Sequence, residues 1–166
     1  LQTFIYMPAN GIVQGMRPVI GYNYGAGESS RVKSTIRYSL LTAAGLMLTG
    51  TILALALPKQ ILALFDADAA LMSAGVTALR IISLGFLVSS VGLIYSGVFE
   101  AIENGRNSLI ISLLRQFVIT IPLSFILTRF FGPTGVWISF PVGELCASAA
   151  AFCLLKKYQN GAFSPL

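Results

Sequence analysis

The chain has 166 residues, of which 55% are hydrophobic and 10% are charged, and its mean hydropathy is +0.80. Ordinary soluble domains carry about 25% charged residues, so this composition excludes a typical soluble domain and favours a membrane protein. The chain contains no histidine, which excludes histidine-based catalysis and metal binding, and the dispersed basic residues behind its net charge of +5 argue against a nucleic-acid partner.

The spacing of the charges predicts five membrane-spanning helices. A spanning helix needs about 20 predominantly apolar residues, and no charged residue lies between Arg37 and Lys59 or between Arg80 and Glu100. Membrane strands would show alternating polarity, which is absent from runs such as LLTAAGLMLTGTILALAL. We therefore expect an all-α, polytopic membrane helix bundle with helices at residues 3–22, 36–57, 78–99, 107–128 and 135–155.

The first expected helix leads into a glycine-rich stretch, PVIGYNYGAGESSRVKSTIRYS, which runs from Pro18 to Ser39. Its glycines, Gly21, Gly25 and Gly27, are typical of a helix end followed by a loop. The alternative, a phosphate-binding loop, would need a G-K-[ST] ending that is absent here. Because the chain starts inside an apolar stretch without an initiating Met, we expect it to be the C-terminal part of a longer membrane protein.

The third expected helix carries a stripe of small residues. Gly85, Ser89, Gly92 and Ser96 lie within about 60° of one another at 100° per residue. Small residues let helix backbones approach closely in lipid, so the stripe predicts a helix–helix interface. The large apolar side chain of Ile94 is expected to face lipid instead.

The fourth and fifth expected helices each hold one charge at membrane depth, Arg115 and Glu144. An arginine there costs about 2.5–3.5 kcal/mol on insertion scales, so Arg115 is expected to point inward and contact an acid. At 1.5 Å per residue the two depths differ by about 4–5 Å, which favours Glu144 over Glu100 as the partner. In the alternative interpretation, Glu144 takes up a proton during transport and Arg115 tunes its affinity. A polar row that includes Gln116 and Thr120 supplies further candidates for the bundle interior or the transport path.

Two blocks of the sequence resemble the multidrug and toxic compound extrusion (MATE) transporters, and the resemblance covers nearly the whole chain in order. The first block is the stretch PVIGYNYGAGESSR, and the second combines an Arg-Gln pair and a proline with FGPTGVWISFPVGE. The matching residues are Pro18, Gly21, Tyr22, Asn23, Tyr24, Gly25, Ala26 and Arg31 in the first block, and Arg115, Gln116, Pro122, Gly132, Gly135, Val136, Trp137, Pro141 and Glu144 in the second.

The resemblance implies that residues 1–166 are most of a C-terminal lobe and contain the family's eighth through twelfth helices. Members of the family are secondary active antiporters of the cell membrane, not enzymes. They export drugs and organic cations against the entry of sodium ions or protons, and two lobes rock about a central cavity. The partners implied are membrane lipid, drug-like substrates and the N-terminal lobe of the same transporter. Neither a metal centre nor an organic cofactor is implied.

The chain departs from the family pattern in two places. Glu100-Ala101-Ile102-Glu103 stands where many members have Gln-Ala-x-Gly, and residues 81–99 contain no acid, although some branches bind the coupling cation there. The coupling ion therefore stays open between sodium and proton. We expect its site to lie outside this chain.

Three other functions are less well supported by the residues. A flippase of the same superfamily, which moves lipid-linked oligosaccharides, would need a cavity lined with basic residues, for which only Arg115 qualifies. A non-transporting structural bundle would need no gating kinks, whereas Pro122 and Pro141 predict kinks in the last two helices. A membrane enzyme would need a nucleophile, a metal or an acid–base pair at one depth, which Arg115 and Glu144 alone do not supply.

The distribution of lysine and arginine between the loops predicts the topology. Cytoplasmic loops of membrane proteins are enriched in these residues, and one side of the expected bundle holds six of them against three on the other. We expect residues 25–33 and 156–166 in the cytoplasm, and Asp66 and Asp68 outside. The six are Arg31, Lys33, Arg37, Arg106, Lys156 and Lys157, and the three are Lys59, Arg80 and Arg129.

Cysteine accessibility in intact cells tests this topology, after the native Cys146 and Cys153 have been replaced by serine. A Ser29→Cys variant is expected to react with an impermeant thiol reagent only after the cells are permeabilised. The matched variant Asp68→Cys is expected to react in intact cells. Labelling of the cysteine at position 29 in intact cells would reverse the predicted orientation.

Overall fold

The computed structural model describes residues 2–65 and 69–162, and within these ranges all of the regular structure is helical. The expected all-α membrane bundle is confirmed, whereas Asp66, Asp68 and residues 163–166 lie outside the described residues. The elements are α1 (Gln2–Gly25), α2 (Ser29–Ala56), α3 (Pro58–Ala63), α4 (Ala69–Ser83), α5 (Phe86–Ala101), α6 (Gly105–Leu113), the π-helix η1 (Leu114–Thr120), α7 (Ile121–Phe131) and α8 (Pro133–Ala162).

Three continuous stretches within the described residues are long and apolar enough to cross a membrane, namely Ser29–Ala56, Gly105–Phe131 and Pro133–Tyr158. They correspond to three of the five expected spans. The bent pair α4 and α5 supplies a fourth candidate span. Helix α1 has 24 residues and is therefore about 36 Å long, but it is less apolar, and its role as a fifth span stays a prediction.

The expected continuous helix at residues 78–99 is wrong, because the chain breaks between α4 and α5 with a bend of 54°. Tight turns replace the α-helical ladder here, since the amides of Leu84 and Gly85 bond to the carbonyls of Ile81 and Ile82. A side chain at Gly85 would place its Cβ 3.0 Å from Cα of Pro141 on α8. The break therefore lies where the backbones of two helices touch.

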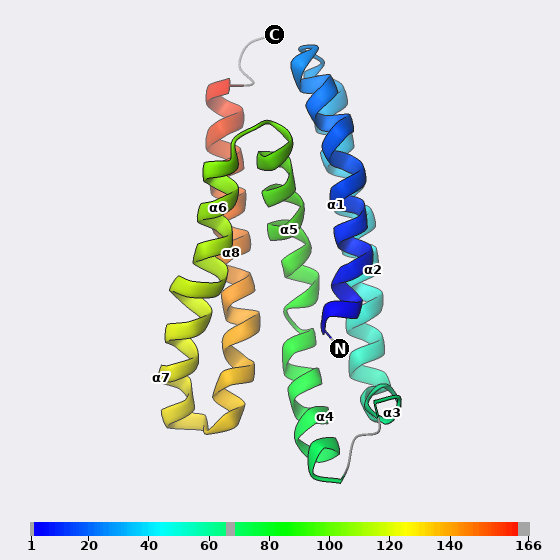
Figure 1. The fold of residues 1–166 in the computed structure, drawn as a ribbon, viewed down its shortest axis with the longest axis vertical. Coiled ribbons are helices and arrows are strands. Elements are labelled where there is room, and N and C mark those ends of the chain that lie inside the picture. Colours follow the sequence, from blue (N-terminus) through cyan, green and yellow to red (C-terminus); the bar gives the residue numbers. More distant parts are fainter. Residues whose placement is uncertain (1, 66–68, 163–166) are drawn as a thin grey trace.

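The helices form two pairs on either side of a central helix (Figure 1). Helix α1 lies in front of α2, α6 lies in front of α8 with α7 beside it, and α5 runs between the pairs and contacts α1, α2, α6 and α8. The α1–α2 loop, the α5–α6 turn and the described end of α8 share one end of the bundle, while α3 and the α7–α8 turn lie at the other. The loops are thus grouped as the charge pattern predicted.

The stretch that joins α6 to α7 is continuous, but its middle is a π-helix rather than the expected regular α-helix. Pro122, the second residue of α7, has no N–H to donate back into this stretch. The hydroxyl of Thr120 donates to the carbonyl oxygen of Arg115 at 2.6 Å and satisfies one acceptor of the widened turns. Such π-helical turns occur frequently at functional sites.

The stripe of small residues on α5 is confirmed as an interface. Ser89 and Ser96 are buried, and a Cβ at Gly92 would lie 3.1 Å from Oγ of Ser148 on α8. The expectation that Ile94 faces lipid is wrong, because this residue is fully buried. Since α5 has neighbouring helices on several sides, little of its circumference remains for lipid.

The close approach at Gly92 predicts a strong effect of a larger side chain. In the complete protein that carries this chain, Gly92→Leu is expected to cost about 1–3 kcal/mol, because overpacking forces the helices apart. The matched control is Gly45→Leu on α2, where an added Cβ meets nothing within 4 Å. Thermal unfolding in detergent, followed by size-exclusion chromatography, compares the two, and equal losses would show that Gly92 marks no interface.

Candidate functional site

A buried ion pair joins η1 to α8 inside the bundle. Nε of Arg115 lies 3.6 Å from Oε2 of Glu144, and Glu144 is 8% exposed. The pairing predicted from the depths of the two charges is confirmed. The hydroxyl of Tyr6 on α1 donates to Oε1 of Glu144 at 3.4 Å, so three helical elements meet at this carboxylate. Tyr6 was missed by sequence reasoning, since a tyrosine near the start of an apolar stretch carries no distinguishing signal.

Two glycines, Gly92 and Gly143, allow neighbouring helices to pack closely around Arg115. A Cβ at Gly92 on α5 would lie 3.4 Å from Nη2 of Arg115, so the guanidinium rests against the backbone of α5. On α8, a Cβ at Gly143 would collide with Oγ1 of Thr120 and lie 3.4 Å from the carbonyl oxygen of Arg115. Both glycines therefore bring neighbouring helices onto the π-helical turns that carry this arginine.

The Arg115–Glu144 pair is electrostatic rather than hydrogen-bonded. The separation of 3.6 Å exceeds the usual 2.7–3.2 Å of an N–H···O bond, and both facing atoms, Nε and Oε2, are buried without a hydrogen-bond partner. Buried polar atoms are normally satisfied. Nε of Arg115 and Oε2 of Glu144 can therefore each still form a hydrogen bond to another group.

A second ion pair joins α1 to α5. Arg17 is paired with Glu100, whose Oε1 accepts a hydrogen bond of 2.8 Å from Ser108 on α6. The hydroxyls of Ser108 and Ser96 lie 2.7 Å apart and extend the network. Glu100, the other acid considered as a partner of Arg115, is thus bound by Arg17 instead. The signal that was overlooked is that Arg17 is the one charged residue within the first expected helix.

Exposed polar residues of α1 flank this second pair. The side of α1 with Val13 and Met16 packs against Gly97 of α5. At 100° per residue, Asn10 and Gln14 lie about 60–100° from Val13, in the direction of Arg17. Both are exposed.

Exposed polar residues of α6 and η1 continue the same surface. Ser108 faces α5, and Ile111 is buried in the core shared with α8. Ser112 and Gln116 lie on the other side of Ser108 from Ile111 and are exposed. The contacts of Glu100 with Arg17 and Ser108 join α1, α5 and α6, and by helical spacing these exposed groups flank that network. The set is here called the polar face and comprises Asn10, Gln14, Arg17, Glu100, Ser112 and Gln116.

The predicted site residues are thus divided between the interior and the surface. Glu144 and Thr120 are buried and Arg115 is largely so, as expected for bundle-interior positions. Gln116 is exposed, which leaves the transport path as the remaining alternative for this residue. The Glu100 side chain is 36% exposed. A role of these residues on a transport path stays a prediction.

The glycines of the first motif have different roles. Gly25 ends α1 and Gly27 has φ +75° in the loop, which confirms the expected helix end. Gly21 lies inside α1 instead, where a Cβ would come 3.1 Å from the carbonyl oxygen of Ala101. Gly21 therefore allows α1 to approach the end of α5.

Polar residues of that motif form hydrogen bonds at the end of the bundle that holds the α1–α2 loop. Asn23 is buried and its amide donates to the carbonyl oxygen of Val19 at 2.7 Å. The hydroxyls of Tyr24 and Tyr158 lie 3.0 Å apart and connect α1 to α8. The remaining motif residues, Pro18, Tyr22, Ala26 and Arg31, are exposed. The first motif therefore supplies contacts that join α1 to α5 and α8.

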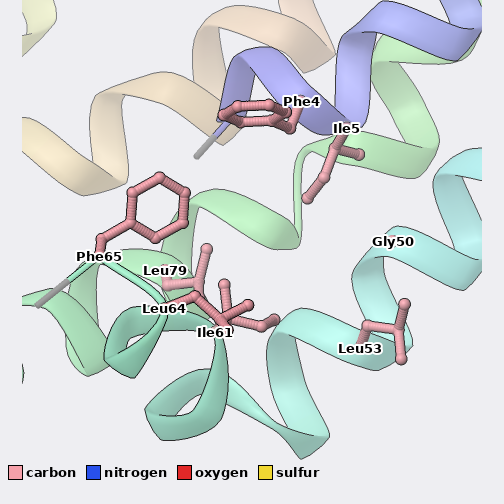
Figure 2. A pocket seen from close by; sticks show the side chains of 8 residues that line it. All are labelled: Phe4, Ile5, Gly50, Leu53, Ile61, Leu64, Phe65 and Leu79. Carbon is pink, nitrogen blue, oxygen red and sulfur yellow. The ribbon is translucent and has the colours of Figure 1, made fainter.

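An apolar pocket of about 360 Å³ lies near α3, between α1, α2 and α4 (Figure 2). It is lined by Phe4, Ile5, Gly50, Leu53, Ile61, Leu64, Phe65 and Leu79. Its side chains offer neither a charge nor a hydrogen bond to a ligand. The polar face and the Arg115–Glu144 pair are therefore the better candidate site.

The geometry predicts that the two buried charges depend on each other. Arg115→Met or Glu144→Gln alone is expected to destabilise the complete protein by up to about 3–5 kcal/mol, because each leaves an uncompensated buried group. The double variant is expected to recover much of the loss. A double-mutant cycle on the yield and melting temperature of folded protein measures this coupling. Strictly additive losses would show that the pair contributes no interaction energy.

The sequence matches the MatE family model over residues 1–126. Among curated relatives, the multidrug export protein MepA of Staphylococcus saprophyticus is 28% identical over 141 residues, which cover 84% of this chain and 31% of the relative. The protein of the same name from Staphylococcus aureus strain N315 is 30% identical with the same coverage. The chain thus spans about a third of the length of these relatives.

Solved structures show the same fold. The MATE multidrug transporter DinF-BH, solved in complex with the dye rhodamine 6G, superposes with a TM-score of 0.87 at 32% identity, over 98% of this chain and 36% of that one. A MOP superfamily transporter from Pyrococcus furiosus reaches 0.92 at 21% identity, over 99% of this chain and 37% of that one. Together with the family-model match, these likenesses show that this multi-pass membrane chain belongs to the MATE family, the family that its two sequence blocks resemble.

Proposed function

We propose that this chain is part of the C-terminal lobe of a multidrug exporter that couples the efflux of organic cations to the entry of sodium ions or protons. The observation that carries the proposal is the polar face. Exposed amides and hydroxyls at membrane depth are costly against lipid, which offers them no hydrogen-bond partner. This face is therefore suited to a water-filled cavity shared with the N-terminal lobe.

Exposed apolar side chains on α2 and α8 are consistent with the same arrangement. Helix α2 exposes Leu48, Ile52 and Leu53, and α8 exposes Leu145 and Phe152. These apolar side chains are suited to hydrocarbon. The lobe thus combines apolar surface fit for lipid with a polar set of residues fit for water and an amphiphilic substrate.

The substrate class rests on relatives. Relatives of this chain are named multidrug export proteins, and a related structure contains rhodamine 6G. We infer that the substrates are drug-like organic cations. We also infer that an ion gradient drives their transport and that no organic cofactor takes part. The described charges argue against the flippase alternative, since Arg17 and Arg115 are each paired with an acid and leave no unbalanced basic lining.

Expression of the complete protein in a drug-sensitive host tests the function. Cells are expected to accumulate several-fold less of a fluorescent organic cation, and to lose this difference when the driving sodium or proton gradient is abolished. Residues 1–166 alone are expected to give no efflux, because cavities of such carriers form between repeats. Absence of efflux under either gradient would overturn the proposed function, and efflux by residues 1–166 alone would overturn the two-lobe arrangement.

A pair of variants tests the role of the polar face in the same assay. Gln116→Leu is expected to reduce efflux at normal expression. Ile52→Leu, at an exposed apolar position of α2, is expected to change nothing. Equal effects of the two changes would show that the polar face does not line the transport path.

A further inference from the structure

We propose that Glu144 is a proton-binding site of the transport cycle, and that its protonation and the binding of an organic cation exclude each other. The proposal rests on the function proposed above and names the coupling ion within it. It also replaces the expectation that the ion site lies outside this chain. The step is a simple exchange: the carboxylate of Glu144 gains a proton from water at Oε2 and later returns it to water on the other side of the membrane.

The surroundings of the carboxylate leave room for the proton. Oε1 of Glu144 accepts from Tyr6 at 3.4 Å, whereas Oε2 faces Arg115 at 3.6 Å without a hydrogen bond. The side chain is nine-tenths buried, since 10% of it is exposed. A proton on Oε2 would therefore break no existing hydrogen bond.

Few other charges lie near this carboxylate. Arg115 of η1 and Tyr6 of α1 are the groups that face it. On α5, Glu100 is bound by Arg17 two turns beyond Gly92, and Arg80 of α4 and Arg129 of α7 are exposed. Among the described residues, Arg115 is the basic side chain that forms an ion pair with Glu144.

A proton fits this site better than a sodium ion does. A metal cation would lie beside the guanidinium of Arg115, and like charges at such distances repel strongly in a medium of low dielectric constant. Hard cations also need several oxygen ligands. No group of three or more His, Cys, Asp or Glu side chains that could hold a metal ion occurs within residues 2–65 and 69–162. A proton needs only the one free oxygen.

Charge balance couples the proton to the substrate. With Glu144 ionised, the two acids Glu100 and Glu144 balance the two bases Arg17 and Arg115. With Glu144 protonated, Arg115 loses its counter-ion and the lobe carries one additional positive charge. Arg115 is 20% exposed, so this charge acts toward the polar face and repels an organic cation. Mutual exclusion of two ligands is the linkage that an antiporter requires.

The first test measures protons directly. Purified complete transporter in weakly buffered solution is expected to release protons when rhodamine 6G binds, and its Kd for the dye is expected to rise about tenfold for each unit fall in pH within the titration range. Glu144→Gln is expected to release no proton and to bind with a flat pH profile. The matched control, Glu103→Gln at an exposed turn, is expected to behave as the wild type.

The second test needs no variant, and so remains decisive if Glu144→Gln does not fold. Dicyclohexylcarbodiimide modifies protonated carboxyls in apolar surroundings, and mass spectrometry of the wild type is expected to find it on Glu144 more at pH 6 than at pH 8. Rhodamine 6G is expected to protect the residue. The proposal would be overturned if Glu144 is not modified, or if its modification is the same at both pH values and unaffected by the dye.

Transport assays separate this inference from the proposed function. Efflux that follows only a sodium gradient, or that keeps its pH dependence in a folded Glu144→Gln variant, would overturn the proton site and leave the drug-export function standing. Failure of the wild type to move any organic cation under either gradient would overturn both.

Discussion

The need of a buried arginine for a counter-ion governs the centre of this structure. An uncompensated guanidinium in lipid is costly, and the requirement is met by a glutamate on the next helix along the chain. Other local features follow from that contact. Gly92 admits the guanidinium beside α5, and Gly143 lets α8 close onto Thr120 and the π-helical turns.

The sequence predicted the features that depend on helix rise and on charge. Depth along a helix is fixed by 1.5 Å per residue, so the distance of Arg115 and Glu144 from their charged helix ends was enough to predict their contact. The small stripe on α5 was predicted from angular spacing in the same way. Membership of the MATE family followed from the two motif blocks, since their order and spacing match along nearly the whole chain.

Other features were not predictable because they depend on neighbours that sequence periodicity does not identify. Ile94 was assigned to lipid, whereas the central position of α5 leaves it without a lipid-facing side there. The ion pair of Arg17 with Glu100 requires the knowledge that α1 packs against α5. Residues 78–99 form one apolar run in the hydropathy pattern, so the pattern gives no indication of the break at Gly85, where α5 lies against Pro141 of α8.

The bend between α4 and α5 also bears on how the bundle matches the thickness of a bilayer. The two helices contain 15 and 16 residues and together are about 46 Å long, whereas a bilayer is about 40–45 Å thick with its headgroup regions. If the 54° bend is shared equally as tilt, the pair spans about 41 Å along the membrane normal. The kink thus fits the segment within the full thickness of the bilayer, headgroup regions included, so that neither end needs to project into bulk water.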